Sequence, residues 1–265
     1  MSLRILKFIV ALFAIGGFGV FLATLDATFR HGTITPPLLT YAVIGGIIPS
    51  LIWLWFWLRE DSLNPEPTRR LLYTFLAGMI IVPWVIPFQQ LFTGGIHENP
   101  GVIIAWAGIE EIFKFAAAYF IILQHREADE PIDMVIYMIT VALGFAAFEN
   151  ALFILNPLVN GEIIDTILTG NLRFFGATLL HVLCSALIGI ALAFGFYRRR
   201  SIRRLYTFIG VILAIGLHAF FNFSIMQTQG GNALSTFAVV WIGIILLILV
   251  FEKVKRIKRL TSLSS

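Results

Sequence analysis

Long apolar runs, separated by short linkers that carry most of the charge, dominate this sequence of 265 residues. A helix needs about 20 apolar residues to cross the hydrocarbon core of a bilayer. Eight stretches meet this requirement, and we expect one transmembrane helix in each. They are residues 4–25, 37–58, 71–92, 100–124, 132–155, 172–197, 205–226 and 232–251. The sequence therefore predicts an all-α fold, a polytopic integral membrane bundle of eight transmembrane helices.

The composition excludes several other classes of protein. Hydrophobic residues make up 58% of the chain and charged residues 13%, against roughly 25% charged residues in soluble domains. One cysteine, Cys184, rules out a disulfide scaffold. The net charge of +4 is not gathered on one recognition element, so no nucleic acid is expected as a partner. No linker is long enough for a second domain, and we expect a single domain over residues 1–265.

The distribution of Lys and Arg predicts the orientation in the membrane. Of the 19 such residues, 16 fall at the termini and linkers on one side of the eight spans, while Arg30 and Arg173 fall on the other. Because positively charged loops stay in the cytoplasm, we expect both termini there, in a multi-pass protein of the cell membrane. The uncharged stretch 8–25 exceeds the usual 7–15-residue core of a signal peptide, so a retained first span is expected. The oligomeric state is left open.

The few ionisable residues inside the predicted spans indicate a functional site. Such groups are costly in the membrane and by default mark function. They lie about 6 to 10 residues, or roughly 9–15 Å, below the outer ends of their spans. They are Glu110, Glu111 and Lys114 in the fourth span, Glu149 in the fifth, His181 in the sixth, and His218 in the seventh, with Asn222 one turn later. Their shared depth predicts one site in the outer half of the bilayer.

The residue types in this set are suited to hydrolysis. Glu110 and Lys114 are four residues apart and are expected to pair, which leaves Glu111 free to act as a general base on water, although the two glutamates could exchange roles. Imidazoles and an amide can hold a developing oxyanion. Alternatively, His181, His218 and Glu149 could bind zinc as three protein ligands, with a fourth position open for water. Metal-free and zinc-dependent hydrolysis of an amide both remain open at this point.

Several motifs resemble those of a known family. Residues 110–114 form an EExxK motif, residues 144–150 read GFAAFEN, and His181 and His218 supply two later histidine motifs. The chain resembles PrsW-type intramembrane proteases, which are related to type II CAAX prenyl endopeptidases and to bacteriocin-processing and immunity proteases. The resemblance covers roughly residues 55 to 225 and places the catalytic core at about residues 100–226. One departure is that CAAX proteases have EExxxR in place of EExxK.

The resemblance implies an intramembrane endopeptidase that cleaves a membrane-anchored protein, such as an anti-sigma factor at its first site. The family is often described as metalloproteases. The residues that the resemblance assigns to the catalytic site are Glu110, Glu111, Glu149 and His181, with His218 and Asn222 similar to an HxxxN motif of the CAAX relatives.

Two other classes of function are consistent with buried polar groups. A proton-coupled transporter or ion-conducting protein also uses chains of Glu and His. A receptor or scaffold would not need several ionisable groups at one depth. The absence of an inverted repeat in the sequence, and the clustering at one depth, favour the protease over the transporter.

Overall fold

The computed structural model describes residues 34–60, 65–93, 99–227 and 233–257. Within these ranges the chain is helical and contains no strand, which confirms the all-α prediction. Two π-helical segments are present: η1 (Tyr119–Leu123) extends α4, and η2 (Arg173–Ala177) joins α6 to α7. The α-helices are α2 (Pro36–Glu60), α3 (Thr68–Thr93), α4 (Pro100–Ala118), α5 (Pro131–Val159), α6 (Ile163–Leu172), α7 (Thr178–Gly195), α8 (Arg200–Gln227) and α9 (Ala233–Val254).

Six helical stretches of the described chain are long and apolar enough to cross a membrane. They correspond to the second, third and fifth to eighth predicted spans. The fourth predicted span coincides with α4 and η1, but its three charged residues set it apart from the six. The first, residues 4–25, lies outside the described residues. The structure thus supports an integral membrane bundle with six spans of the eight predicted.

The sixth span differs most from its predicted boundaries. Instead of beginning near residue 172, it is part of a continuous helix from Ile163 to Gly195 formed by α6, η2 and α7. The predicted start at residue 172 left the polar residues Thr166 and Asn171 outside the span. However, the Thr166 hydroxyl donates to the carbonyl of Glu162 (2.8 Å) and the Asn171 amide donates to the carbonyl of Ile167 (2.9 Å). These side chains are satisfied by the preceding turn, so the helix can contain them.

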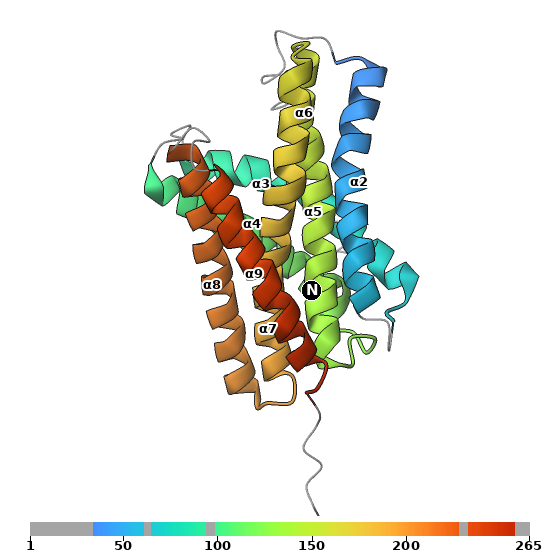
Figure 1. Cartoon of the computed structure of the whole chain (residues 1–265). Helices are drawn as coiled ribbons and strands as arrows, with labels where there is room; N and C mark the ends of the chain where they lie inside the picture. Colours follow the sequence, from blue (N-terminus) through green and yellow to red (C-terminus); the bar gives the residue numbers. More distant parts are fainter. Residues whose placement is uncertain (1–33, 61–64, 94–98, 228–232, 258–265) are drawn as a thin grey trace, which may run out of the picture.

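Helix α5 forms the centre of the bundle, with α2, α3 and α7 packed around it (Figure 1). Its residues from Pro131 to Ala147 are buried on every side. The backbones of α3 and α5 approach closely at two glycines. A Cβ atom on Gly144 would collide with the carbonyl oxygen of Phe75, and one on Gly78 would collide with that of Val141. Small residues at a membrane helix interface allow such close packing, so α3 and α5 lie backbone against backbone at these positions.

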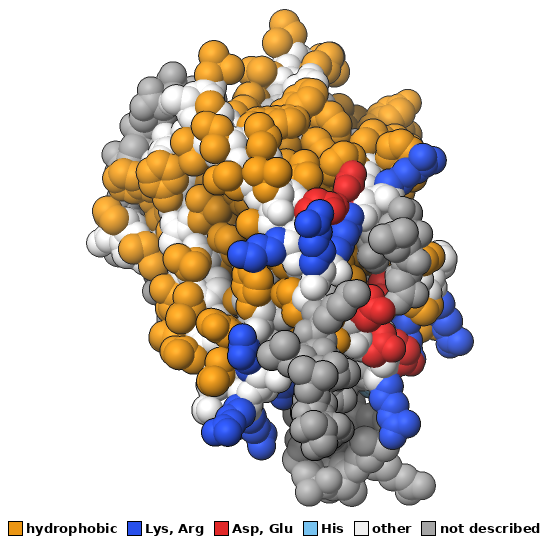
Figure 2. All heavy atoms as spheres, turned by 60° about the horizontal axis from the view of Figure 1, so that its bottom comes forward, with side chains coloured by type: hydrophobic (Ala, Val, Ile, Leu, Met, Phe, Trp, Pro, Cys, Tyr) orange, Lys and Arg blue, Asp and Glu red, His pale blue; other side chains and the backbone are white. Residues whose placement is uncertain are grey.

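Charged side chains gather at one end of the molecule, and Figure 2 shows this end turned toward the viewer. The linkers between η1 and α5 and between α7 and α8 lie there, as do the last residue of α2, Glu60, and the end of α9 (Figure 1). In one of these linkers, Glu127 accepts a hydrogen bond from Arg70. The pKa of the Glu127 carboxyl is lowered, first by a backbone hydrogen bond and further by Arg70. The described linkers that were predicted to share one side of the membrane therefore do lie at one end of the bundle.

Candidate active site

Polar side chains from five helices meet in one buried cluster, which we call the central cluster. Glu111 and Lys114 are fully buried, His181 and His218 are each 2% exposed, and Glu110 is 6% exposed. The structure thus brings together the ionisable residues that the sequence placed at a shared depth. The cluster consists of Gln89 on α3, Glu110, Glu111 and Lys114 on α4, Glu149 on α5, His181 on α7 and His218 on α8.

Lys114 lies at the middle of the central cluster. Its Nζ is 2.5 Å from Oε1 of Glu111, 2.9 Å from Nδ1 of His181 and 4.0 Å from Oε2 of Glu110. The expected pair of Lys114 with Glu110 is therefore present, but Glu111 lies closer to Lys114, and the expectation that Glu111 is left free is wrong. Residues three and four positions away both face Lys114 on a helix, so neighbouring helices decide the pairing. Here His218 and Ser185 both contact the Glu111 carboxylate, at 2.8 and 3.4 Å.

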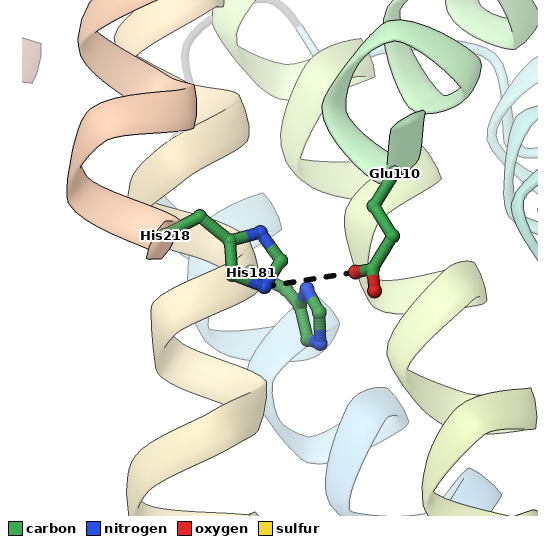
Figure 3. Close-up of side chains that lie close together, drawn as sticks. All are labelled: Glu110, His181 and His218. Atoms are coloured by element: carbon green, nitrogen blue, oxygen red, sulfur yellow. Dashed lines mark ion pairs between the residues drawn. The ribbon is translucent and has the colours of Figure 1, made fainter. Parts of the chain in front are cut away.

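The hydrogen-bond network assigns the protons of the two histidines. The Lys114 ammonium can only donate, so Nδ1 of His181 accepts and the ring proton is on Nε2. That Nε2 lies 2.9 Å from Oε2 of Glu149 and donates to it. His218 has the opposite tautomer, because its Nδ1 lies 2.8 Å from Oε1 of Glu111. Nε2 of His218 faces Oε2 of Glu110 at 3.6 Å, the contact drawn as a dashed line in Figure 3.

The carboxylate of Glu110 is only half satisfied. Its Oε1 accepts a hydrogen bond from the Gln89 amide (3.0 Å). Its Oε2 is buried and has no hydrogen-bond partner within the described chain. In Figure 3 this carboxylate points toward the imidazoles of His181 and His218, which approach from two other helices. A buried oxygen without a donor is unfavourable unless something else binds there, so this position is the open end of the cluster.

Glu149 is held at the opposite side of His181 by a residue that the sequence analysis did not include in the site. Arg173 donates from Nη2 to Oε2 of Glu149, and from Nε to Oδ1 of Asn150 at 2.5 Å. The Asn150 amide in turn donates to the Thr178 hydroxyl at 2.9 Å. Arg173 had been counted only among the charges of the outer side, at the start of the sixth predicted span. The signal that could have identified it is its position about two helical turns before His181.

Three residues next to the central cluster make few or no contacts with it. Ser185 contacts Glu111 from α7, and Cys184 is a free, buried thiol. Asn222 is half-buried one turn after His218, and the described structure gives its side chain no hydrogen bond. Its expected role as an oxyanion donor therefore stays a prediction.

The residues present fit a metal ion in number and kind. Ligand atoms of Glu110, His181 and His218 lie within 4.8 Å of one another. Two imidazoles and one carboxylate are a ligand set of catalytic zinc, and Oε2 of Glu110 is the unpartnered atom of the group. His181 would have to release Lys114 or Glu149 to take part. Glu149, expected from the sequence as the third ligand, lies behind His181, and Glu110 stands in its place within this group.

Comparison with known proteins gives matches to one protein family. A family model described as "PrsW family intramembrane metalloprotease" matches residues 66–250. The chain is 28% identical over 193 residues to Protease PrsW of Geobacillus kaustophilus, covering 71% of this chain and 80% of that protein. It is 29% identical over 188 residues to Protease PrsW of Clostridioides difficile, covering 68% and 77%.

A third relative aligns over more of its length. Protease PrsW of Shouchella clausii is 23% identical over 222 residues, which cover 83% of this chain and 98% of that protein. No solved structure gives a significant match. Because the matched residues 66–250 include every helix that supplies the central cluster, this chain belongs to the PrsW family of intramembrane proteases.

Proposed function

We propose that the central cluster hydrolyses a peptide bond in a membrane-anchored protein, with an anti-sigma factor as the substrate class that the motifs suggest. The observation that carries this proposal is the buried Oε2 of Glu110, which has no hydrogen-bond donor and faces Nε2 of His218 at 3.6 Å. A water molecule bound beside this oxygen would donate a hydrogen bond to it and lie next to the imidazole of His218. Activation of water by a positioned carboxylate is general base catalysis.

Glu110 is better suited than Glu111 to act as the base. Glu111 is contacted by Lys114, His218 and Ser185. A carboxylate with this many donors is stabilised in its charged form and is a weak base. Glu110 has one hydrogen bond, from Gln89. Glu111 instead orients His218, as a carboxylate orients the imidazole of a catalytic triad. This exchanges the roles expected from the sequence.

Each group then has a defined part in the proposed reaction. Glu110 takes a proton from water as the hydroxide adds to the carbonyl carbon of the substrate. His218, adjacent through Nε2, relays that proton to the amine nitrogen as the carbon–nitrogen bond breaks. Asn222, on the same face of α8 as His218, is the proposed donor to the oxyanion, an interaction that is typically among the largest in acyl transfer.

Zinc is the proposed cofactor, and metal-free hydrolysis by the same carboxylate is the alternative. Glu110, His181 and His218 would hold the ion, which when bound lowers the pKa of a water ligand toward neutrality. The roles of Glu110 as base and His218 as proton relay belong to the metal-free reaction. Three residues have the same role with or without the metal. Glu111 orients the imidazole of His218, Glu149 orients that of His181, and Lys114 supplies the positive charge between Glu111 and His181.

We further propose that the termini are cytoplasmic and that the central cluster lies in the outer half of the bilayer. The gathering of Lys and Arg at one end of the bundle supports this orientation (Figure 2).

The direct test is cleavage of a membrane-anchored reporter by the full chain in liposomes. Glu110→Gln is expected to lose about 100-fold or more of the activity. The control is Glu162→Gln, the same change at an exposed carboxylate just before α6, and it should cleave at the wild-type rate. Proton flux is followed in the same liposomes with a pH-sensitive dye. Flux abolished by Glu110→Gln, without any cleavage by the wild type, would favour the transporter instead.

A further inference from the structure

Arg173 reaches from η2 to three neighbouring residues of α5. Its guanidinium contacts the carboxylate of Glu149 and the amide oxygen of Asn150, and it lies 3.9 Å from the ring centroid of Phe153. The side chain is only 13% exposed. A planar guanidinium with several fixed donors suits such a multiple contact better than an ammonium does. Arg173 is therefore held by three contacts in a largely buried position, unlike an arginine in an exposed surface ion pair.

The backbone around Arg173 is unusual in a way that serves this contact. Arg173 is the first residue of η2, the π-helical turn between α6 and α7. Single π-helical turns inside helices are rare and occur frequently at functional sites. Eight positions later the same helix carries His181, which contacts the same carboxylate oxygen, Oε2 of Glu149. Arg173 and His181, both on the continuous helix formed by α6, η2 and α7, therefore bind the same oxygen atom, Oε2 of Glu149 on α5.

The charges of the cluster require a second cation near Glu149. Three carboxylates face one ammonium, Lys114, and that ammonium lies against Glu111 on the far side of His181. His181 itself is a neutral hydrogen-bond donor to Glu149 in this network. Without Arg173, Glu149 would be a largely buried carboxylate with no cationic contact, an arrangement that is strongly unfavourable.

We propose that Arg173 is a positioning residue of the proteolytic site. It holds Glu149 so that Oε2 accepts the Nε2 proton of His181, and it thereby fixes the tautomer that turns the Nδ1 lone pair toward Lys114 and the reacting centre. Carboxylates behind a functional imidazole commonly have this role. The effect on catalysis rests on the proposed function above, whereas the effect on the His181 tautomer does not.

The kinetic test compares Arg173→Gln with Arg173→Lys in liposomes. Arg173→Gln should lower kcat about 10- to 100-fold, as loss of an outer partner of a functional group does, while KM for the reporter stays nearly unchanged. Arg173→Lys should recover part of kcat, because the ammonium restores the positive charge but not the several fixed donors of the planar guanidinium. The matched control is Arg126→Gln, an exposed arginine in the linker before α5, which should behave as wild type.

A double variant separates positioning from simple folding. Arg173→Gln leaves Glu149 without its ion pair, so it is combined with Glu149→Gln, and the double variant removes both charges together. If Arg173 acts through Glu149, adding Arg173→Gln to Glu149→Gln should have little further effect on kcat, because coupled residues are not additive. Independent, multiplying effects on kcat would overturn the proposal.

Nitrogen NMR of protein labelled in its histidine rings gives a readout that needs no activity. The wild type should show His181 protonated at Nε2, and Arg173→Gln should shift it toward a mixture of tautomers. An unchanged His181 tautomer and an unchanged kcat in Arg173→Gln would refute the role of Arg173 while leaving the proteolytic function intact. A changed tautomer in a protein that cleaves no membrane-anchored reporter would instead support the positioning and refute the proposed function.

Discussion

Nζ of Lys114 lies 2.9 Å from Nδ1 of His181, so a buried cation on α4 is bonded to a neutral imidazole on α7. The contact links two halves of a polar network. On one side Lys114 continues to Glu111 and His218, and on the other His181 continues to Glu149. Apart from the Lys114–Glu111 contact within α4, each of these contacts joins two helices, so the network ties α4, α5, α7 and α8 together.

Removal of Lys114 should destabilise the protein as well as inactivate it. Lys114→Met leaves Glu111 buried without a cation, and breaking a buried pair in this way costs about 3–5 kcal/mol. The double variant Lys114→Met/Glu111→Gln removes both charges and should regain most of the unfolding free energy but not the activity. Unfolding in detergent and reporter cleavage measure the two effects. A Lys114→Met single variant as stable as wild type would contradict the pairing.

The two adjacent glutamates should differ when each is changed to glutamine. Glu110→Gln should keep nearly the wild-type unfolding free energy, since its Oε2 has no donor to lose, and should lose activity about 100-fold or more. Glu111→Gln should lose both stability and activity, because it unpairs Lys114. Ser185→Ala serves as the control, and it should retain most activity since its contact with Glu111 is long, at 3.4 Å. Equal stability of both glutamine variants would speak against this division of roles.

Close packing of α3 on α5 should be sensitive to one methyl group. Gly144→Ala places a Cβ against the Phe75 carbonyl oxygen, which is backbone and cannot turn aside. Overpacking of this kind typically costs about 1–3 kcal/mol or more. The matched control is Gly216→Ala on α8, where a Cβ would meet nothing within 4 Å in the described structure and helix propensity should favour alanine. Thermal unfolding of both variants tests this, and equal midpoints would refute the close approach.

The sequence predicted the helices far better than it predicted their contacts. Apolar runs separated by charged linkers identify spans directly, so the predicted 132–155 lies within the observed Pro131–Val159. The start of the sixth span was missed because Thr, Asn and Arg are typical of linkers. In a long helix these side chains can bond to the preceding turn or to a neighbour, as Arg173 does with Glu149, and sequence does not reveal which of these occurs.

The same contrast holds for the site: the depth of its residues could be predicted from the sequence, but their contacts could not. The shared depth of Glu110, Glu149, His181 and His218 could be inferred by counting residues along helices. The partner of Lys114 could not, because Glu110 and Glu111 are both within its reach along α4. Contacts from α7 and α8 decide between them, and those depend on how the helices rotate about their axes in the bundle.

Metal analysis distinguishes the two proposed forms of hydrolysis. If zinc binds at Glu110, His181 and His218, purified wild type should contain about one zinc per chain, and chelation should abolish cleavage until zinc is restored. His218→Ala should lower the zinc content, whereas Asn222→Ala should not. Elemental mass spectrometry of the wild type and both variants gives the stoichiometry. Zinc-free wild type that cleaves at full rate in the presence of a chelator would contradict the zinc site and leave the metal-free reaction.

The orientation can be tested at two exposed positions of the described chain, in a Cys184→Ala background that removes the buried thiol. Arg126 lies in the linker between η1 and α5, at the end where positive charge gathers, and Glu162 lies just before α6 at the opposite end (Figure 1). Because Lys and Arg loops remain in the cytoplasm, Arg126→Cys should react with a membrane-impermeant maleimide only after the cells are opened. Glu162→Cys should react in intact cells. Retained reporter cleavage shows that both variants are folded, and labelling of both from the same side would refute the topology.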